Sequence, residues 1–110
     1  MDKQTMIDRL MALPVEIAAA ENSVLQASGR LILAKEALQA KEDSLLLGNV
    51  LDGKNAEMRA AQARQYTQTE REMVADADLL IKNASAKLNQ LRDEFRALQS
   101  VAALLRGDAA

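Results

Sequence analysis

The sequence predicts an all-α fold, an antiparallel helical hairpin of the coiled-coil type. Apolar residues repeat every seven positions over residues 3–47 and again over residues 55–106, a spacing that places them on one face of a helix. Between these patterns, residues 48–54 contain Asp52-Gly53, a strong turn dipeptide because Gly accepts positive φ without a Cβ penalty. Only one Pro and four Gly interrupt the 110 residues, and β-branched residues are scattered singly, which argues against a sheet.

The first helical pattern has large residues at one seam position and mostly Ala at the other, which allows a second helix to approach closely. These residues are Leu10, Ile17, Val24, Leu31, Leu38 and Leu45, and then Leu13, Ala20, Ala27 and Ala34. Pro14 cannot accept a normal preceding helical turn, so we expect a short helix at 3–12 and a long one at 14–47. A kinked continuous helix is the alternative. In either case we expect the segment before Pro14 to lie along the second arm. Gly29 is interpreted as tolerated inside the helix, with close approach of a neighbour as the alternative.

The second pattern contains no Pro and no internal Gly, so it predicts one helix over residues 55–106. Asn55 is expected to cap this helix by accepting a backbone hydrogen bond, and Glu57 suits its positive first turn. Gly107 is expected to end it. The two seam positions are Ala60, Thr67, Val74, Ile81, Leu88, Phe95 and Ala102, and then Ala63, Glu70, Ala77, Ala84, Leu91, Leu98 and Leu105.

A further apolar stripe beside each seam predicts self-association, because a single hairpin cannot cover so wide an apolar surface. These stripes are Met11, Ala18, Leu25, Ile32 and Leu46 on the first arm, and Met73, Leu80 and Val101 on the second. We therefore expect a homo-oligomer, in the simplest case a dimer that forms a four-helix bundle. The residues expected to carry packing and assembly are Ile17, Val24, Leu31, Leu38, Ile81, Leu88, Phe95 and Leu98.

The residue types offer little chemistry. The chain has neither Cys nor His, so the usual thiolate and imidazole metal ligands and the usual general base are missing. The carboxylates of Glu70, Glu72, Asp76 and Asp78 are interpreted as a solvated face. Gly53-Lys54 lacks the spacing, the hydroxyl residue and the preceding strand of a phosphate-binding loop. We expect no enzyme and no catalytic, cofactor or metal site.

Charge and hydropathy bear on location and partners. The net charge is −2, and acidic and basic residues are interspersed, which gives no electrostatic drive toward nucleic acid or an anionic membrane. The N-terminus has no signal-peptide pattern, and no apolar run approaches the ~20 residues that cross a bilayer. The expected location is the cytoplasm, without membrane binding.

Residues 52–62 contain a short motif, G-K-N-x-x-x-R-x-A-Q, at the turn and the start of the second arm. The motif resembles one found in small, mostly uncharacterised helical proteins of bacteriophages and prophages, often encoded among early replication and recombination genes. The resemblance implies a non-enzymatic accessory protein in a bacterial cytoplasm. A competing resemblance, to secreted helical hairpins with a Trp-x-Gly turn, is weaker because the chain has no Trp and no Tyr-based export signal.

The leading functional expectation is a self-associating hairpin that offers helix faces to a protein partner. Gly53 and Asn55 are assigned to the turn, and the partner surface is placed at the loop end. That surface would comprise Lys54, Arg59, Arg64 and Tyr66. One alternative is a nucleic-acid-binding accessory factor that uses the basic start of the second arm. A second alternative is an inhibitor of a host enzyme or defence complex.

Overall fold

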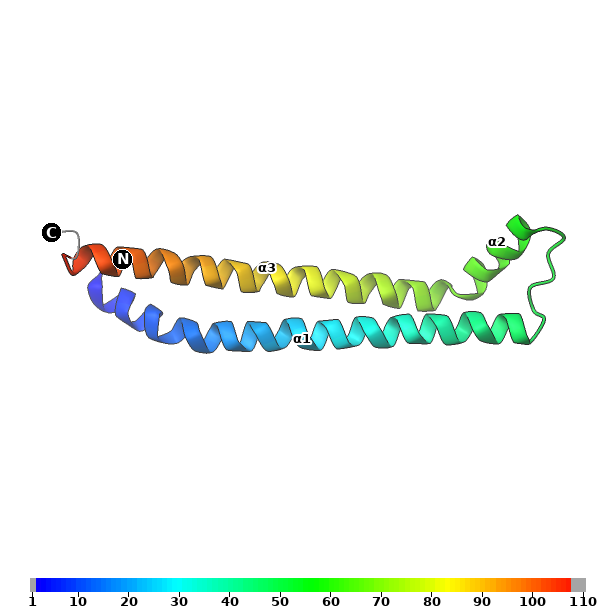
Figure 1. Cartoon of the computed structure of the whole chain (residues 1–110), viewed down its shortest axis with the longest axis horizontal. Helices are drawn as coiled ribbons and strands as arrows, with labels where there is room; N and C mark the ends of the chain where they lie inside the picture. Colours follow the sequence, from blue (N-terminus) through cyan, green and yellow to red (C-terminus); the bar gives the residue numbers. More distant parts are fainter. Residues whose placement is uncertain (1, 108–110) are drawn as a thin grey trace. The chain divides into compact units, whose positions relative to one another are not determined.

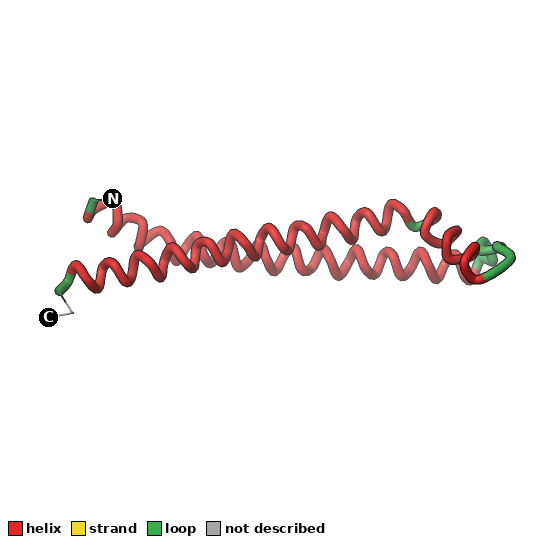
Figure 2. Tube along the Cα trace, turned by 90° about the horizontal axis from the view of Figure 1, so that it is seen from above, coloured by secondary structure: helices red, strands yellow, loops and turns green. Residues whose placement is uncertain are grey.

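In the computed structural model, which describes residues 2–107, the chain is almost entirely helical and this part contains no strand (Figure 1 and Figure 2). Helix α1 spans Lys3–Leu47, α2 spans Ala56–Tyr66 and α3 spans Gln68–Leu105. The long helices α1 and α3 pack against each other. The predicted all-α class is therefore confirmed.

The described residues group into two compact units. Among the described residues, unit 1 combines residues 2–25 with residues 82–107, and unit 2 comprises residues 26–81. Each unit contains one section of α1 and one section of α3. In unit 1 the sections run antiparallel, because Glu21 contacts Arg92 while residues near the start of α1 share a pocket with Ala102 and Leu105.

The core of unit 1 is a cluster of large aliphatic side chains from both sections. Its buried members are Met6, Leu13, Ala20, Leu88, Leu91 and Leu98, and Leu10, Ile17, Val24 and Phe95 pack against them half-buried. Five of the eight residues expected to carry packing and assembly thus lie in or against this core, namely Ile17, Val24, Leu88, Phe95 and Leu98. Met6 and Leu13 precede Pro14, so the expectation that this segment lies along the second arm is confirmed.

The expected division of the first arm at Pro14 is wrong, and the continuous alternative holds. Helix α1 runs through Pro14 without interruption. The proline removes one backbone donor and crowds the preceding turn, and the first turns of α1 bend toward α3 in Figure 1. Burial of Met6 and Leu13 on α3 offsets that local loss.

The α1–α3 seam of unit 2 consists largely of alanine. Ala27, Ala34 and Ala77 are buried there, and Leu45 is buried nearer the loop. Four large residues at the predicted seam positions of this unit, Leu31, Leu38, Val74 and Ile81, are only half-buried. Small residues let two helices approach closely, but they also fill little of the space beside the contact line.

The predicted single helix over residues 55–106 is also wrong, since it is divided at Thr67. This residue has φ −110° and ψ 15° and is completely buried. Its N–H and its hydroxyl both donate to the carbonyl of Ala63, at 3.1 and 2.6 Å. Ser23 and Ser100 form the same hydroxyl bond inside unbroken helices, so Thr67 differs from them in its complete burial and in accepting a hydrogen bond from Arg71. Helix α3 begins at the next residue.

Candidate functional site

The loop of unit 2 begins with a compact helix end that the sequence did not reveal. Asn49 has a positive φ of 55°. The N–H of Val50 donates to the carbonyl of Leu45 at 3.2 Å, and that of Asn49 to Leu46 at 3.3 Å. This pair of bonds is a Schellman motif, and Asn substitutes there for the more common Gly because its short polar side chain tolerates the left-handed region.

Gly53 lies in the turn as expected, but the reason is different. It does not have positive φ; among the described glycines only Gly107 does. A Cβ on Gly53 would instead lie 2.8 Å from the Cβ of Met58 and 2.9 Å from the backbone nitrogen of Arg59. Gly53 is therefore required because α2 packs directly against the loop.

Polar side chains of the sequence motif hold this loop against α2. Gln62 accepts a hydrogen bond from the N–H of Gly53 at 2.8 Å and donates to the carboxylate of Asp52 at 2.6 Å. Arg59 donates to the carbonyl of Gly53 at 3.1 Å. The predicted cap is confirmed, because Asn55 accepts from the N–H of Met58 at 2.9 Å. The motif of residues 52–62 is thus a structural clamp.

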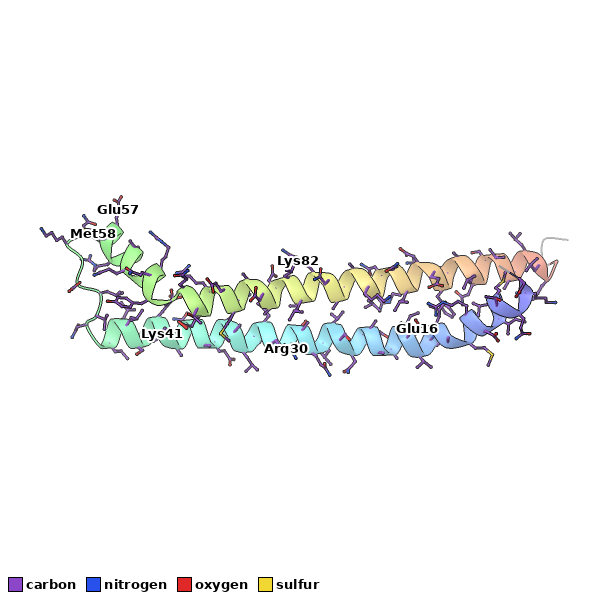
Figure 3. All side chains as sticks on the ribbon, turned by 180° about the vertical axis from the view of Figure 1, so that it is seen from behind. Glu16, Arg30, Lys41, Glu57, Met58 and Lys82 are labelled. Atoms are coloured by element: carbon purple, nitrogen blue, oxygen red, sulfur yellow. The ribbon has the colours of Figure 1, made fainter. Side chains whose placement is uncertain are left out.

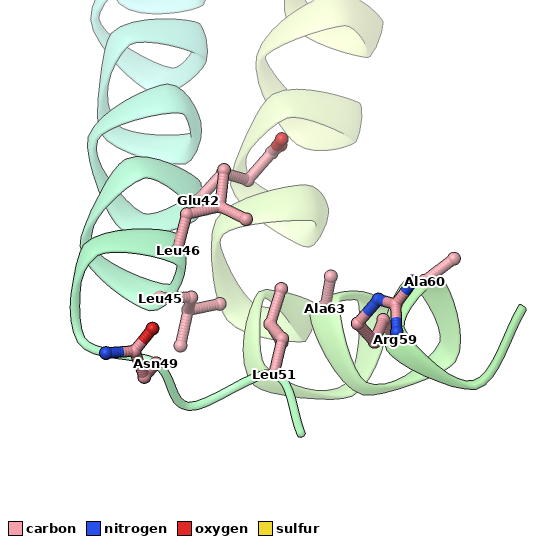
Figure 4. Close-up of a pocket in the computed structure, with 8 residues that line it drawn as sticks. All are labelled: Glu42, Leu45, Leu46, Asn49, Leu51, Arg59, Ala60 and Ala63. Carbon is pink, nitrogen blue, oxygen red and sulfur yellow. The ribbon is translucent and has the colours of Figure 1, made fainter. Parts of the chain in front are cut away.

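A cleft of about 420 Å³ lies between the end of α1, the loop and α2. Leu51 points from the loop into the space between Leu45 on α1 and Ala63 on α2 (Figure 4). The lining of the cleft is mostly apolar, and Glu42 and Arg59 supply charged groups. The cleft is therefore a place where an apolar group could be received at the loop end of unit 2.

The predicted partner surface is only partly available. Lys54 and Arg64 are exposed and Tyr66 is 49% exposed, but the guanidinium of Arg59 is engaged with the loop. Figure 3 shows Glu57 and Met58 at the start of α2 pointing away from α1. Met58 is 49% exposed next to these residues, which the sequence did not indicate, because helix periodicity alone does not distinguish an exposed methionine from a packed one.

Unit 2 also carries a groove between α1 and α3, with a volume of about 360 Å³. We call it the unit 2 groove, lined by Arg30, Leu33, Ala34, Met73, Asp76, Ala77 and Leu80. A further cleft between α1 and α3 of unit 2, of about 440 Å³, has a different lining that includes Leu31, Lys35 and Val74. Both arise where the alanine seam leaves space between the helices.

The two predicted apolar stripes are exposed, although they do not join as one surface in unit 2. Their large members are between 39% and 75% exposed. Met73 and Leu80 of the second stripe line the unit 2 groove, but their neighbour from α1 is Leu33 and not Ile32. Consecutive helical residues point about 100° apart. The sequence pattern placed Ile32 in the stripe, but its neighbour Leu33 is the residue that faces the groove.

Unit 1 carries ion pairs across its helices. Arg9 donates to both carboxylate oxygens of Glu94, at 2.7 and 2.8 Å, and also pairs with Glu16. These carboxylates raise the pKa of Arg9, with Glu94 contributing most, and the hydrogen bond from Arg9 lowers the pKa of Glu94. Glu21 and Arg92 form a longer contact at 3.2 Å.

Three further findings concern acidic clusters, helix hydropathy and known proteins. Within residues 2–107, no group of acidic side chains is arranged to hold a metal ion. In the same range, no helix has both the length and the apolar character that spanning a bilayer requires. Comparisons with protein families, with curated proteins and with solved structures found no match to this chain.

Proposed function

We propose that this chain is a non-enzymatic helical protein that associates with itself and binds a protein partner. The observation that carries the proposal is the exposure of large apolar side chains on both α1 and α3, among them Leu33 at 66% and Met73 at 51%. Large apolar side chains that are grouped on the surface of a small protein mark an interaction site. Two copies that pack into a four-helix arrangement would cover it.

The free energy gained by burying these side chains is comparable to the entropic cost of association. Complete burial of one large aliphatic side chain contributes ~1.5–3 kcal/mol. Loss of translational and rotational freedom on association costs ~4–15 kcal/mol. Burying a few such side chains from each copy is therefore enough to offset the entropic term.

Sedimentation equilibrium at several micromolar concentrations tests the proposal. We expect a mass that rises with concentration toward a multiple of the 12.0 kDa chain, in the simplest case a dimer. A single species of the monomer mass throughout that range would contradict it.

The nucleic-acid alternative rests on basic side chains at the start of the second arm, and Arg59 among them already has a structural partner. Its guanidinium donates to the carbonyl of Gly53 in the loop. Titration with single- and double-stranded DNA at two salt concentrations tests this alternative. Binding that weakens steeply with salt and is lost in Arg64→Ala would favour it. Arg59→Ala is less informative because it also disturbs the loop.

A phage or prophage origin is supported only by the resemblance of residues 52–62. The clamp formed by Asp52, Arg59 and Gln62 offers a physical reason for such a motif to recur, since each residue has a defined bonding role. A small accessory protein of this kind would act through its surfaces, either as an assembly factor or as an inhibitor of a host enzyme or defence complex. Neighbouring genes and binding partners would distinguish these two roles.

A further inference from the structure

The unit 2 groove combines an apolar floor with apolar rims. Ala34 and Ala77 are buried at the seam, and the side chains of Leu33, Met73 and Leu80 are 66%, 51% and 44% exposed. Leu33 belongs to α1, whereas Met73 and Leu80 belong to α3. Each helix therefore contributes an exposed apolar edge to the same groove.

In unit 1 the equivalent heptad positions are occupied by an ion pair and not by a groove. Arg30 and Met73 each lie three heptads from Arg9 and Glu94 in their helices, so in an antiparallel pair they are the equivalent facing positions in unit 2. In unit 1 these positions are joined by a direct ion pair between the two helices. In unit 2 they flank an open groove of about 360 Å³. We infer from this contrast that a second molecule completes the packing of the two helix sections of unit 2.

The groove also carries one charge of each sign, on opposite walls. Arg30 stands on α1 (labelled in Figure 3), and Asp76 stands on α3. Between residues 2 and 107, no ion pair engages either of these two side chains. Both are exposed, so both are available to a partner that carries the matching charges.

We propose that the unit 2 groove binds the same groove of a second copy, with Arg30 of each copy facing Asp76 of the other. A two-fold axis along the groove places the α1 wall of one copy over the α3 wall of its partner. In such an interface, if one residue contacts a second, the second also contacts the first. One positive and one negative wall are then self-complementary, and Leu33 meets the edge formed by Met73 and Leu80. This inference rests on the self-association proposed above and gives it a surface.

Charge reversal tests the pairing directly. Arg30→Asp and Asp76→Arg each place like charges on facing walls, which disfavours the interface. We expect each single variant to raise the dimer dissociation constant by about tenfold or more, since two equivalent pairs are affected in every dimer. The double variant R30D/D76R restores opposite charges in the reverse order, and it should dimerise within about threefold of the unmodified chain.

Lys35→Asp is the matched control, because it reverses a charge on the same helix but lines the other cleft of unit 2. It should leave the dissociation constant unchanged. Far-UV circular dichroism of every variant establishes that the helices are intact. Raising the salt concentration should weaken the unmodified dimer and bring the single variants closer to it.

The outcomes separate this inference from the more general proposal. Dimers of normal affinity in both single variants would overturn the groove pairing and leave self-association standing. Weakening by Lys35→Asp instead would assign the interface to the other cleft. Failure of the double variant to recover would exclude the Arg30–Asp76 contact. A strictly monomeric unmodified chain would overturn both this inference and the proposed self-association.

Discussion

At the scale of single residues, the two glycines of unit 2 that the sequence analysis considered have opposite roles. Gly53 has no space for a Cβ, whereas a Cβ on Gly29 would meet nothing within 4 Å. The interpretation of Gly29 as merely tolerated inside the helix is thereby confirmed. These two positions allow the same substitution to be tested in two environments.

We predict that Gly53→Ala destabilises the protein and that Gly29→Ala stabilises it. The methyl group added at position 53 would force the backbone of Arg59 and the side chain of Met58 to move, at a cost of ~1–3 kcal/mol. Alanine at position 29 should raise the free energy of unfolding by up to ~1 kcal/mol, because glycine is the poorer helix former. Urea unfolding at one fixed protein concentration measures both. Equal effects of the same sign would contradict the difference in packing.

The ion pair of Arg9 with Glu94 makes the stability of unit 1 depend on pH. Because the pKa of Glu94 is lowered from its ordinary value of 4.5, the folded state favours the ionised carboxylate. Its contribution is complete above that ordinary pKa and is lost as the pH falls through the lowered pKa of the folded state. Acidification below about pH 4.5 should therefore remove it.

We predict that Glu94→Gln lowers the free energy of unfolding at pH 7, and that the difference from the unmodified chain shrinks below pH 4.5. The pair is partly exposed, so the effect at neutral pH is modest. Glu36→Gln, which removes an exposed carboxylate from α1, controls for the change in net charge. A difference that stays constant down to pH 3 would show that the amide acts through packing and not through charge.

At the scale of the elements, the heptad pattern predicted the helices and their buried faces but not their boundaries. Leu13, Ala20, Ala27 and Ala34 recur every seven residues and are all buried. The break at Thr67 carries no Pro or Gly signal, so helix propensity could not predict it. The side chain at the break is completely buried, and burial is a tertiary property.

The opposite error occurred at Pro14. A proline predicts a break when only local cost is considered. Here the same helical segment also buries Met6 and Leu13 and forms the Arg9–Glu94 contact with α3. Contacts with residues more than eighty positions away outweigh a local loss. The hydrogen bonds of the loop clamp could be predicted only in part. Asn55 follows capping rules, but Gln62 and Asp52 meet only after the chain has turned.

We predict that Thr67→Val weakens the junction between α2 and α3. Valine keeps the branched shape but loses the hydroxyl that donates to Ala63 and accepts from Arg71. The expected loss is ~1 kcal/mol in the free energy of unfolding. Thr69→Val makes the same chemical change at an exposed position of α3 and should have a smaller effect. Equal losses at both positions would mean that the buried hydroxyl contributes nothing specific.

At the scale of the whole molecule, the two units differ in what stabilises them. Unit 1 has large buried side chains and ion pairs between its helices. Unit 2 has an alanine-rich seam between α1 and α3 and two adjacent open clefts. Burial of alanine contributes much less than burial of leucine, because the free energy follows the apolar area removed from water. The isolated chain should therefore open more readily in unit 2.

We predict that amide hydrogen exchange in dilute solution is faster in residues 68–81 of α3 than in residues 82–98 of the same helix. Local opening exposes amides according to the free energy that holds each region closed, and one helix carries both regions, so the comparison is internal. If unit 2 forms the proposed dimer interface, raising the protein concentration should slow exchange in residues 68–81 and in the facing section of α1, and should leave unit 1 almost unchanged. Uniform exchange along α3 at every concentration would mean that the alanine seam closes unit 2 as firmly as the leucine core closes unit 1.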